Sequence, residues 1–243
     1  MILMKRLAFS VGDYFYGTMI IPDPIKRLIE EFASLPSIGP RQATRLAFHL
    51  LNSGRAKIES LKNAVAALNA VTYCKQCFFY FSPKKADSEN ALSKTPMSAD
   101  NGLCEICRRK DRGPKTICLV EKETDLISIE TSGVHTGIYF ILGGHLTLES
   151  SLIKKHMKNG PQLAKARLGA LKRLIEVKLD GQADEIIIAF SPTTEGDLTS
   201  LYLKKELTPF AKRITRLGRG IPTGGDIEFA DEQTLEEALK NRS

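Results

Sequence analysis

Four of the five cysteines in this 243-residue chain form two C-x-x-C pairs, Cys74/Cys77 and Cys104/Cys107. Two such pairs can place four thiolates tetrahedrally around Zn²⁺. The 26 residues between the pairs exceed the usual spacing, but the entropy of loop closure grows slowly with length. No secretory signal precedes the pairs, which favours a metal over disulfides. The pattern predicts a closed, structural zinc site; unligated thiols and a redox dithiol are the alternatives.

Three acidic residues follow apolar runs that have the character of buried strands. Glu121 comes directly after the run 116–120, and Glu195 and Asp197 follow the run 185–190 after a Ser-Pro-Thr-Thr turn. Functional sites in open α/β sheets gather at the carboxyl ends of strands. In an extended segment, Glu195 and Asp197 would point to the same side. Carboxylates suit Mg²⁺, so these three residues are a candidate magnesium site; the alternative is solvated loop acids.

The segment Leu35-Pro-Ser-Ile-Gly-Pro-Arg41 separates two helical patterns and resembles a helix-hairpin-helix turn. Backbone N–H groups at the start of the second helix carry partial positive charge and can hold a DNA phosphate. Arg41 and Arg45 lie one helical turn apart and can reach the same DNA backbone. The pattern predicts sequence-independent DNA binding; an ordinary helical hairpin with exposed arginines is the alternative.

The remaining polar motifs carry less chemistry. The Gly-rich stretch 216–225 lacks the G-x-x-x-x-G-K-[ST] order of a nucleotide-binding P-loop and is expected to form turns. The four histidines are scattered and are expected to be surface or core residues. Cys118 falls inside an apolar run and is expected in the core.

The charge is uneven along the chain. Lys and Arg total 35 against 28 Asp and Glu, a net charge of +7. Residues 1–115 hold 18 basic and 10 acidic residues, whereas residues 116–243 hold 17 and 18. A localised basic excess indicates a polyanion partner, nucleic acid first, with a solvated basic surface as the alternative.

Hydrophobic periodicity places these motifs on alternating helices and strands. The 42% hydrophobic content is that of a globular chain and excludes disordered and fibrous classes, and no apolar run has the length of a membrane span. The alternation predicts a parallel α/β sheet. Helices are expected at 23–32, 41–51, 58–70, 124–131, 163–179 and 199–207, with Asp23 as a cap, and strands at 116–120, 138–142, 185–190 and 213–217.

Several long motifs occur in a distinctive order: LPSIGPRQATRLAFHLL, the paired cysteines, LVEKETDLISIETSGVHTGIYFILGGHL, PTTEGDLTSLYL and TRLGRGIPTGGDIEFADEQTLEEAL. Over roughly residues 20–243 the sequence resembles the RecR family of bacterial recombination mediators. The family's α/β unit is a Toprim domain, whose glutamate matches Glu121 and whose second acidic motif matches Glu195 and Asp197. The basic residues of the family's hairpin match Arg41 and Arg45.

The sequence departs from the family pattern at four places. Ser37 replaces the hairpin glycine, the insert between the cysteine pairs is longer, and the stretch 147–151 after GGHL lacks the usual prolines. The first 18 residues are additional, so either Met1 or Met19 is the start of the native chain.

The resemblance implies an α/β fold with an N-terminal helix-hairpin-helix, a small zinc finger, a Toprim-type parallel domain and a C-terminal extension. The expected division is an extension at 1–19, the helix-hairpin-helix at 20–73, the zinc finger with its insert at 74–112, the Toprim domain at 113–212 and a C-terminal segment at 213–243.

The resemblance also implies a function in DNA repair without enzymatic activity. RecR-like proteins form ring-shaped homo-oligomers, for instance tetramers, that can encircle DNA. They act in the bacterial cytoplasm, at the nucleoid, with RecO and RecF to help RecA replace single-strand binding protein on gapped or single-stranded DNA. Two alternatives are a Mg²⁺-dependent Toprim nuclease or primase-like enzyme using Glu121, Glu195 and Asp197, and a zinc-ribbon RNA-binding protein.

Overall fold

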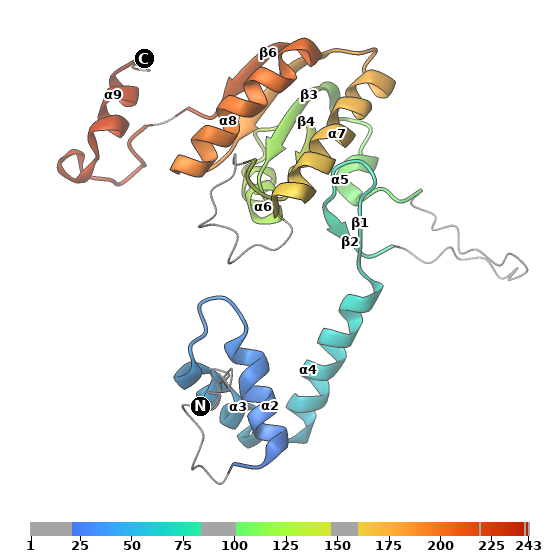
Figure 1. Cartoon of the computed structure of the whole chain (residues 1–243), viewed down its shortest axis with the longest axis vertical. Coiled ribbons are helices and arrows are strands. Elements are labelled where there is room, and N and C mark those ends of the chain that lie inside the picture. Colours follow the sequence, from blue (N-terminus) through green and yellow to red (C-terminus); the bar gives the residue numbers. More distant parts are fainter. Residues whose placement is uncertain (1–20, 84–100, 147–159, 219, 241, 243) are drawn as a thin grey trace, which may run out of the picture. The chain divides into compact units, whose positions relative to one another are not determined.

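The computed structural model describes residues 21–83, 101–146, 160–218, 220–240 and 242. The N-terminal extension 1–19, most of the insert between the cysteine pairs and the stretch 147–151 therefore lie outside the described residues. The chain divides into two compact units, the first ending at Asn69 and the second beginning at Ala70 (Figure 1). The finer division into five segments stays a prediction.

Among its described residues, the first unit contains three helices: α2 (Asp23–Ala33), α3 (Pro40–Asn52) and α4 (Arg55–Ala67), which is followed by a 3₁₀ turn at Leu68–Ala70. Helices α2 and α3 pack together around a small core. The core is built on fully buried Ile29, Ala43 and Ala47, with Ile25, Leu28, Phe32 and Ile38 packed against them. Alanines at two successive turns of α3 let the two helices approach closely, which fixes the connecting turn between them.

Two helix starts differ from the sequence prediction. Asp23 lies in the first turn of α2 and Pro22 occupies the cap position. A carboxylate there still complements the helix dipole, and it lies 3.7 Å from the Lys26 ammonium. Helix α4 starts at Arg55, three residues earlier than expected, because Gly54 adopts a left-handed φ of 84° that reverses the chain directly after α3.

Helix α4 leaves its apolar stripe uncovered. The sequence pattern predicted one apolar face, and Leu61, Val65 and Leu68 on that face are 37%, 59% and 64% exposed. Within the described part of the chain, no residue of α4 is buried. The helix is therefore amphipathic, and these three apolar side chains stay exposed among the described residues.

The second unit contains the predicted parallel sheet. Its strands are β3 (Gly113–Val120), β4 (Gly137–Ile141), β5 (Ala183–Ala189) and β6 (Ala211–Arg216), in the order β4-β3-β5-β6, with every pair parallel. Helices α6 (Glu123–Ser132), α7 (Gly160–Lys178) and α8 (Thr194–Leu207) provide the connections. The α/β class is thus confirmed.

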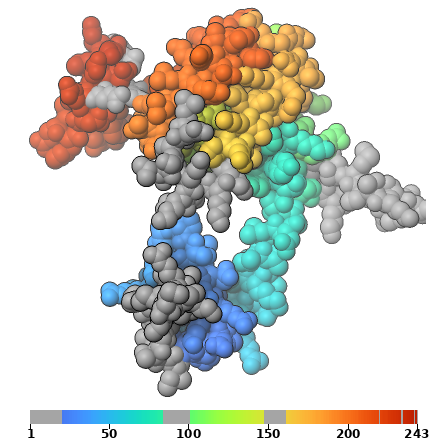
Figure 2. All heavy atoms as spheres, in the orientation of Figure 1, coloured from blue at the N-terminus to red at the C-terminus, as the bar shows by residue number. Residues whose placement is uncertain are grey.

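Strict alternation along the strands divides the core between the two faces of the sheet. Ile117 and Leu119 of β3 face α7 and α8, whereas Cys118 and Val120 face α6. The larger cluster includes Leu168, Leu171 and Ile175 of α7 and Leu203 and Leu207 of α8. In Figure 2 the atoms of α7 and α8, yellow to orange, form a continuous surface on this side of the second unit.

Several short elements were not predicted from the sequence. They are the hairpin β1 (Thr72–Tyr73) and β2 (Tyr80–Phe81), helix α5 (Glu105–Arg108), 3₁₀ turns at Thr208–Phe210 and Ile227–Phe229, and helix α9 (Glu232–Lys240). Asp231 precedes α9 and accepts the N–H of Thr234 at 2.9 Å, a side-chain cap that its sequence position could have revealed. Among the described residues, no helix is both long and apolar enough to cross a membrane.

The turn between α2 and α3 holds a serine in the left-handed region, where glycine is favoured. Ser37 has φ 65°, at the position where the family pattern has glycine. A side chain with a Cβ costs about 1–2 kcal/mol in this conformation. The hairpin thus keeps its backbone shape at an energetic cost.

We expect Ser37→Gly to raise the free energy of unfolding by about 0.5 kcal/mol, because the relief of strain exceeds the added entropy of the unfolded chain. Ser34→Gly is the matched control. Ser34 has φ −75° and its hydroxyl donates to the Glu31 carbonyl at 2.7 Å, so this variant should be destabilised. Thermal and urea unfolding measure the stability of both variants. Equal destabilisation of the two variants would show that the backbone of Ser37 is not strained.

Candidate metal and nucleic-acid sites

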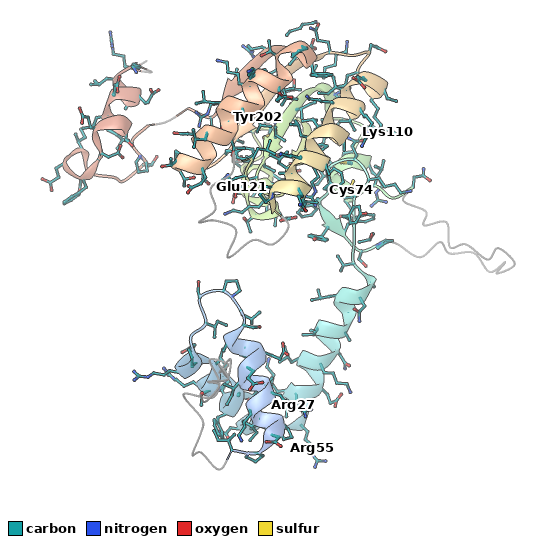
Figure 3. All side chains as sticks on the ribbon, viewed as in Figure 1. Arg27, Arg55, Cys74, Lys110, Glu121 and Tyr202 are labelled. Atoms are coloured by element: carbon teal, nitrogen blue, oxygen red, sulfur yellow. The ribbon has the colours of Figure 1, made fainter. Side chains whose placement is uncertain are left out.

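The two cysteine pairs come together in one cluster. Cys74 follows β1 and Cys77 precedes β2, while Cys104 caps α5 and Cys107 lies within it. All four Sγ atoms lie within 4.8 Å of one another, and those of Cys77 and Cys104 are 3.6 Å apart. Figure 3 labels Cys74 beside the sheet of the second unit. The four cysteines are therefore positioned to bind a metal ion.

Backbone N–H groups support the cluster by donating to its sulfurs. Gln76 donates to the Cys74 Sγ at 3.5 Å, Phe79 to the Cys77 Sγ at 3.4 Å, and Cys107 to the Cys104 Sγ at 3.5 Å. Such bonds orient the ligands and favour their thiolate forms. A hydrogen bond from the Cys107 thiol lowers the pKa of Cys104 to about 7. Four closely spaced thiolates form a closed set, suited to a structural ion with no open position.

The cysteine module is attached to the outer edge of the sheet. The Ile141 N–H of β4 donates to the Cys77 carbonyl at 3.0 Å, so the module continues the hydrogen bonding of the edge strand. Phe78 packs edge-on against Phe140 with ring centroids 5.3 Å apart. The Arg167 guanidinium lies 4.6 Å from the Phe78 ring centre and donates to the Ile141 carbonyl at 3.3 Å. The module, the sheet edge and α7 thus form one packed unit.

The hairpin presents two unpaired arginines beside a free helix N-terminus. Arg41 and Arg45 are exposed on α3, and neither pairs with an acidic side chain in the described ranges. Gly39 occupies the cap position of α3, and no side chain of the described residues caps it. The first N–H groups of α3 are therefore available to an anion, with both guanidinium groups nearby.

The acidic residues do not meet in the expected way. Thr193 caps α8 by accepting the Gly196 N–H at 3.1 Å, so Glu195 and Asp197 lie in the first turn of a helix. The two side chains would point to the same side only in an extended segment, and that condition is not met, because residues two apart in a helix point in different directions. Within the described parts of the chain, only the cysteines form a group of three or more potential metal ligands that close together.

Two of the three acidic residues have side-chain partners for which the sequence predicted no function. Glu121 lies at the end of β3, labelled in Figure 3, and its carboxylate is 3.2 Å from the His145 Nε2. The Asp197 carboxylate accepts from the Arg216 guanidinium at 2.5 Å. The sequence positions of these two partners could have indicated the contacts. His145 follows β4 and Arg216 ends β6, and the carboxyl ends of parallel strands lie at the same edge of a sheet.

Three family models match consecutive parts of the chain. They describe the RecR helix-hairpin-helix at residues 25–68, a Toprim domain at 115–218 and the RecR C-terminal region at 220–243. The fold and the cysteine cluster thus define a Toprim protein with a helix-hairpin-helix and four cysteines positioned to bind a metal ion.

Curated relatives identify the family. Proteins named recombination protein RecR are 36% identical over 92% of this chain in Chloroflexus aggregans and 34% identical over 92% in Herpetosiphon aurantiacus, and 95% of each relative is covered. The relative from Roseiflexus castenholzii is 34% identical, covering 93% of this chain and 97% of its own. The chain belongs to the RecR family of recombination proteins.

Gly196 is required by the turn that places the acids of α8. A Cβ at this position would lie 2.1 Å from the Ser191 carbonyl oxygen, a backbone atom that cannot rotate away. We expect Gly196→Ala to lower the free energy of unfolding by about 2 kcal/mol. Gly169→Ala, where a Cβ on α7 meets open space, should be neutral or stabilising by about 0.5 kcal/mol. Urea unfolding compares them, and equal stability of the two variants would refute the close contact.

Proposed function

We propose that this protein is a DNA-binding recombination mediator that acts with RecO and RecF to promote RecA loading on gapped or single-stranded DNA. Its membership of a family of recombination proteins supports this role. The main observation in favour of DNA binding is the hairpin, where Arg41 and Arg45 lie beside the N-terminal end of α3, which no side chain of the described residues caps. The arrangement suits a phosphate backbone of any sequence.

In this proposal the four cysteines hold Zn²⁺ as a structural ion. Thiolate ligands in two C-x-x-C pairs are the usual zinc set. Three of the four cysteines, Cys74, Cys77 and Cys104, are buried and accept a backbone N–H at sulfur, which fits this set. The ion would connect the turn of Cys74 and Cys77 to the turn of Cys104 and Cys107. Cys77 and Phe78 connect the cysteine module to β4. Since the set is closed, the proposed function uses the ion for stability and not for catalysis.

The proposed assembly is a homo-oligomeric ring in the bacterial cytoplasm, at the nucleoid. The uncovered apolar face of α4 supports self-association, because an exposed stripe of Leu61, Val65 and Leu68 is costly in water. For RecO or RecF, α8 offers a second surface, where Glu195 lies one turn from the exposed Leu198 and near Leu201. The proposed role of the second unit is therefore to bind partners and not to cleave DNA.

Replacing both Arg41 and Arg45 with Ala should weaken binding to gapped DNA about tenfold at low salt and equally for all sequences. The dependence of log K on log salt should flatten by about 2, one for each phosphate that the variant no longer neutralises. Fluorescence anisotropy over a salt series measures both quantities, and RecA assembly on protein-coated single strands should slow in parallel.

Lys62→Ala is the matched control for this experiment, because Lys62 is also an exposed base of the first unit but is paired with Glu59 at 3.1 Å. Its removal should leave the salt dependence nearly unchanged. An unchanged slope in the arginine variant, or an equal change in both variants, would count against the hairpin as the DNA site.

Purified protein should contain about one zinc ion per chain. Cys104→Ser should lose the ion and lower the thermal unfolding temperature, since metal binding is coupled to folding. Cys118→Ala should keep the ion, because Cys118 lies in β3 and outside the cluster. Elemental analysis and calorimetry test this, and a metal-free protein with unchanged stability would exclude the zinc assignment.

A further inference from the structure

The acidic edge of the sheet is occupied by side chains of the chain itself. The Glu121 carboxylate lies 3.2 Å from the His145 Nε2, and Asp197 is paired with Arg216. Magnesium in proteins is held through carboxylates in near-octahedral oxygen coordination. Here each of these two carboxylates faces a nitrogen, and among the described residues no third potential ligand joins either pair. The residues present do not fit the Mg²⁺ site expected from the sequence.

His145 is held in place from its far side. Its Nδ1 lies 3.5 Å from the Thr199 hydroxyl, and that oxygen also accepts the Leu146 N–H at 3.1 Å. The Thr199 oxygen accepts from Leu146, and its own O–H can donate to Nδ1; in that tautomer the imidazole carries its proton on Nε2, facing Glu121. Thr199 is fully buried on α8. The imidazole therefore has an orientation fixed by the fold.

Arg216 plays the corresponding part for Asp197. It is the last residue of β6, and its guanidinium reaches the first turn of α8. The side chains of Glu121 and His145 are only 13% and 24% exposed, so that pair is shielded from competing water. The two pairs link the ends of β3 and β6 to α8 and to the residues after β4.

We propose that His145 and Arg216 take the place of a divalent ion at this edge, so that the Toprim acids of this protein are held by protein side chains and do not require a metal. The inference rests on one part of the proposed function, namely that the second unit binds partners at this edge of the sheet and does not catalyse a reaction. Glu195, which has no side-chain partner within the described residues, is then the acid left for an external contact.

The experiment measures the binding of Mn²⁺ to the zinc-loaded full chain. Bound Mn²⁺ is detected by its electron paramagnetic resonance spectrum. The wild-type protein should show no bound Mn²⁺ that depends on Glu121. A His145→Ala/Arg216→Ala double variant, verified as folded by circular dichroism, should bind Mn²⁺ at least about tenfold more tightly, because the Glu121 and Asp197 carboxylates lose the nitrogen partners that now occupy them. Adding Glu121→Gln should abolish that gain. Glu121-dependent binding by the wild type, or no gain in the folded double variant, overturns the proposal.

A double-mutant cycle tests the pairing without metal. Glu121→Gln and His145→Ala should each lower stability, and together less than additively, with a coupling of about threefold or more in the unfolding equilibrium constant. The Glu195→Gln and His145→Ala pair is the control and should be additive. Additivity in the first cycle overturns the pairing. DNA affinity is a separate measurement, so failure of the mediator function and failure of this proposal can be told apart.

Discussion

The hydrogen bond from the Ile141 N–H to the Cys77 carbonyl joins the cysteine module to the parallel sheet of the second unit. An edge strand exposes a row of unpaired backbone groups, which invites pairing with other chains. On β4 the cysteine module covers one of these groups, and the arginines Arg112 and Arg167 donate to the Gly137 and Ile141 carbonyls. Arg167 in turn lies over Phe78 of the module. Metal binding, sheet completion and core packing are thereby parts of one folding event.

The basic residues of β6 and of α3 differ in how they are paired. Along the other edge strand, β6, the side chains of Lys212 and Arg213 lie 2.8 Å from those of Asp184 and Glu185 on β5. These cations are largely neutralised by neighbours. On α3, in contrast, Arg41 and Arg45 lack an acidic neighbour in the ranges that the structure describes. Two basic residues of the first half of the chain are thus left without an acidic neighbour among the described residues.

Local sequence patterns predicted what depends on local forces. The apolar runs 116–120 and 185–190 predicted the strands, because burial on both faces of the sheet selects apolar residues there, and the C-x-x-C spacing predicted the cysteine cluster. Contacts between distant segments were not accessible in this way. The Thr193 cap moved Glu195 into a helix, and the partners His145 and Arg216 meet their acids only through the strand order. The exposure of the apolar face of α4 could not be predicted either, because hydrophobic periodicity shows that a helix is amphipathic but does not show what covers its apolar face.

The position of Cys118 has a practical consequence for labelling chemistry. It is 2% exposed in β3, and burial raises the pKa of its thiol to about 12. Thiolate is the reactive form, so this residue is inert toward alkylating reagents in the native fold. The other four cysteines are the metal-binding set, which an ion would protect. Native, metal-loaded protein therefore offers a silent thiol background, against which one engineered surface cysteine can carry a fluorophore or spin label without removing any natural cysteine.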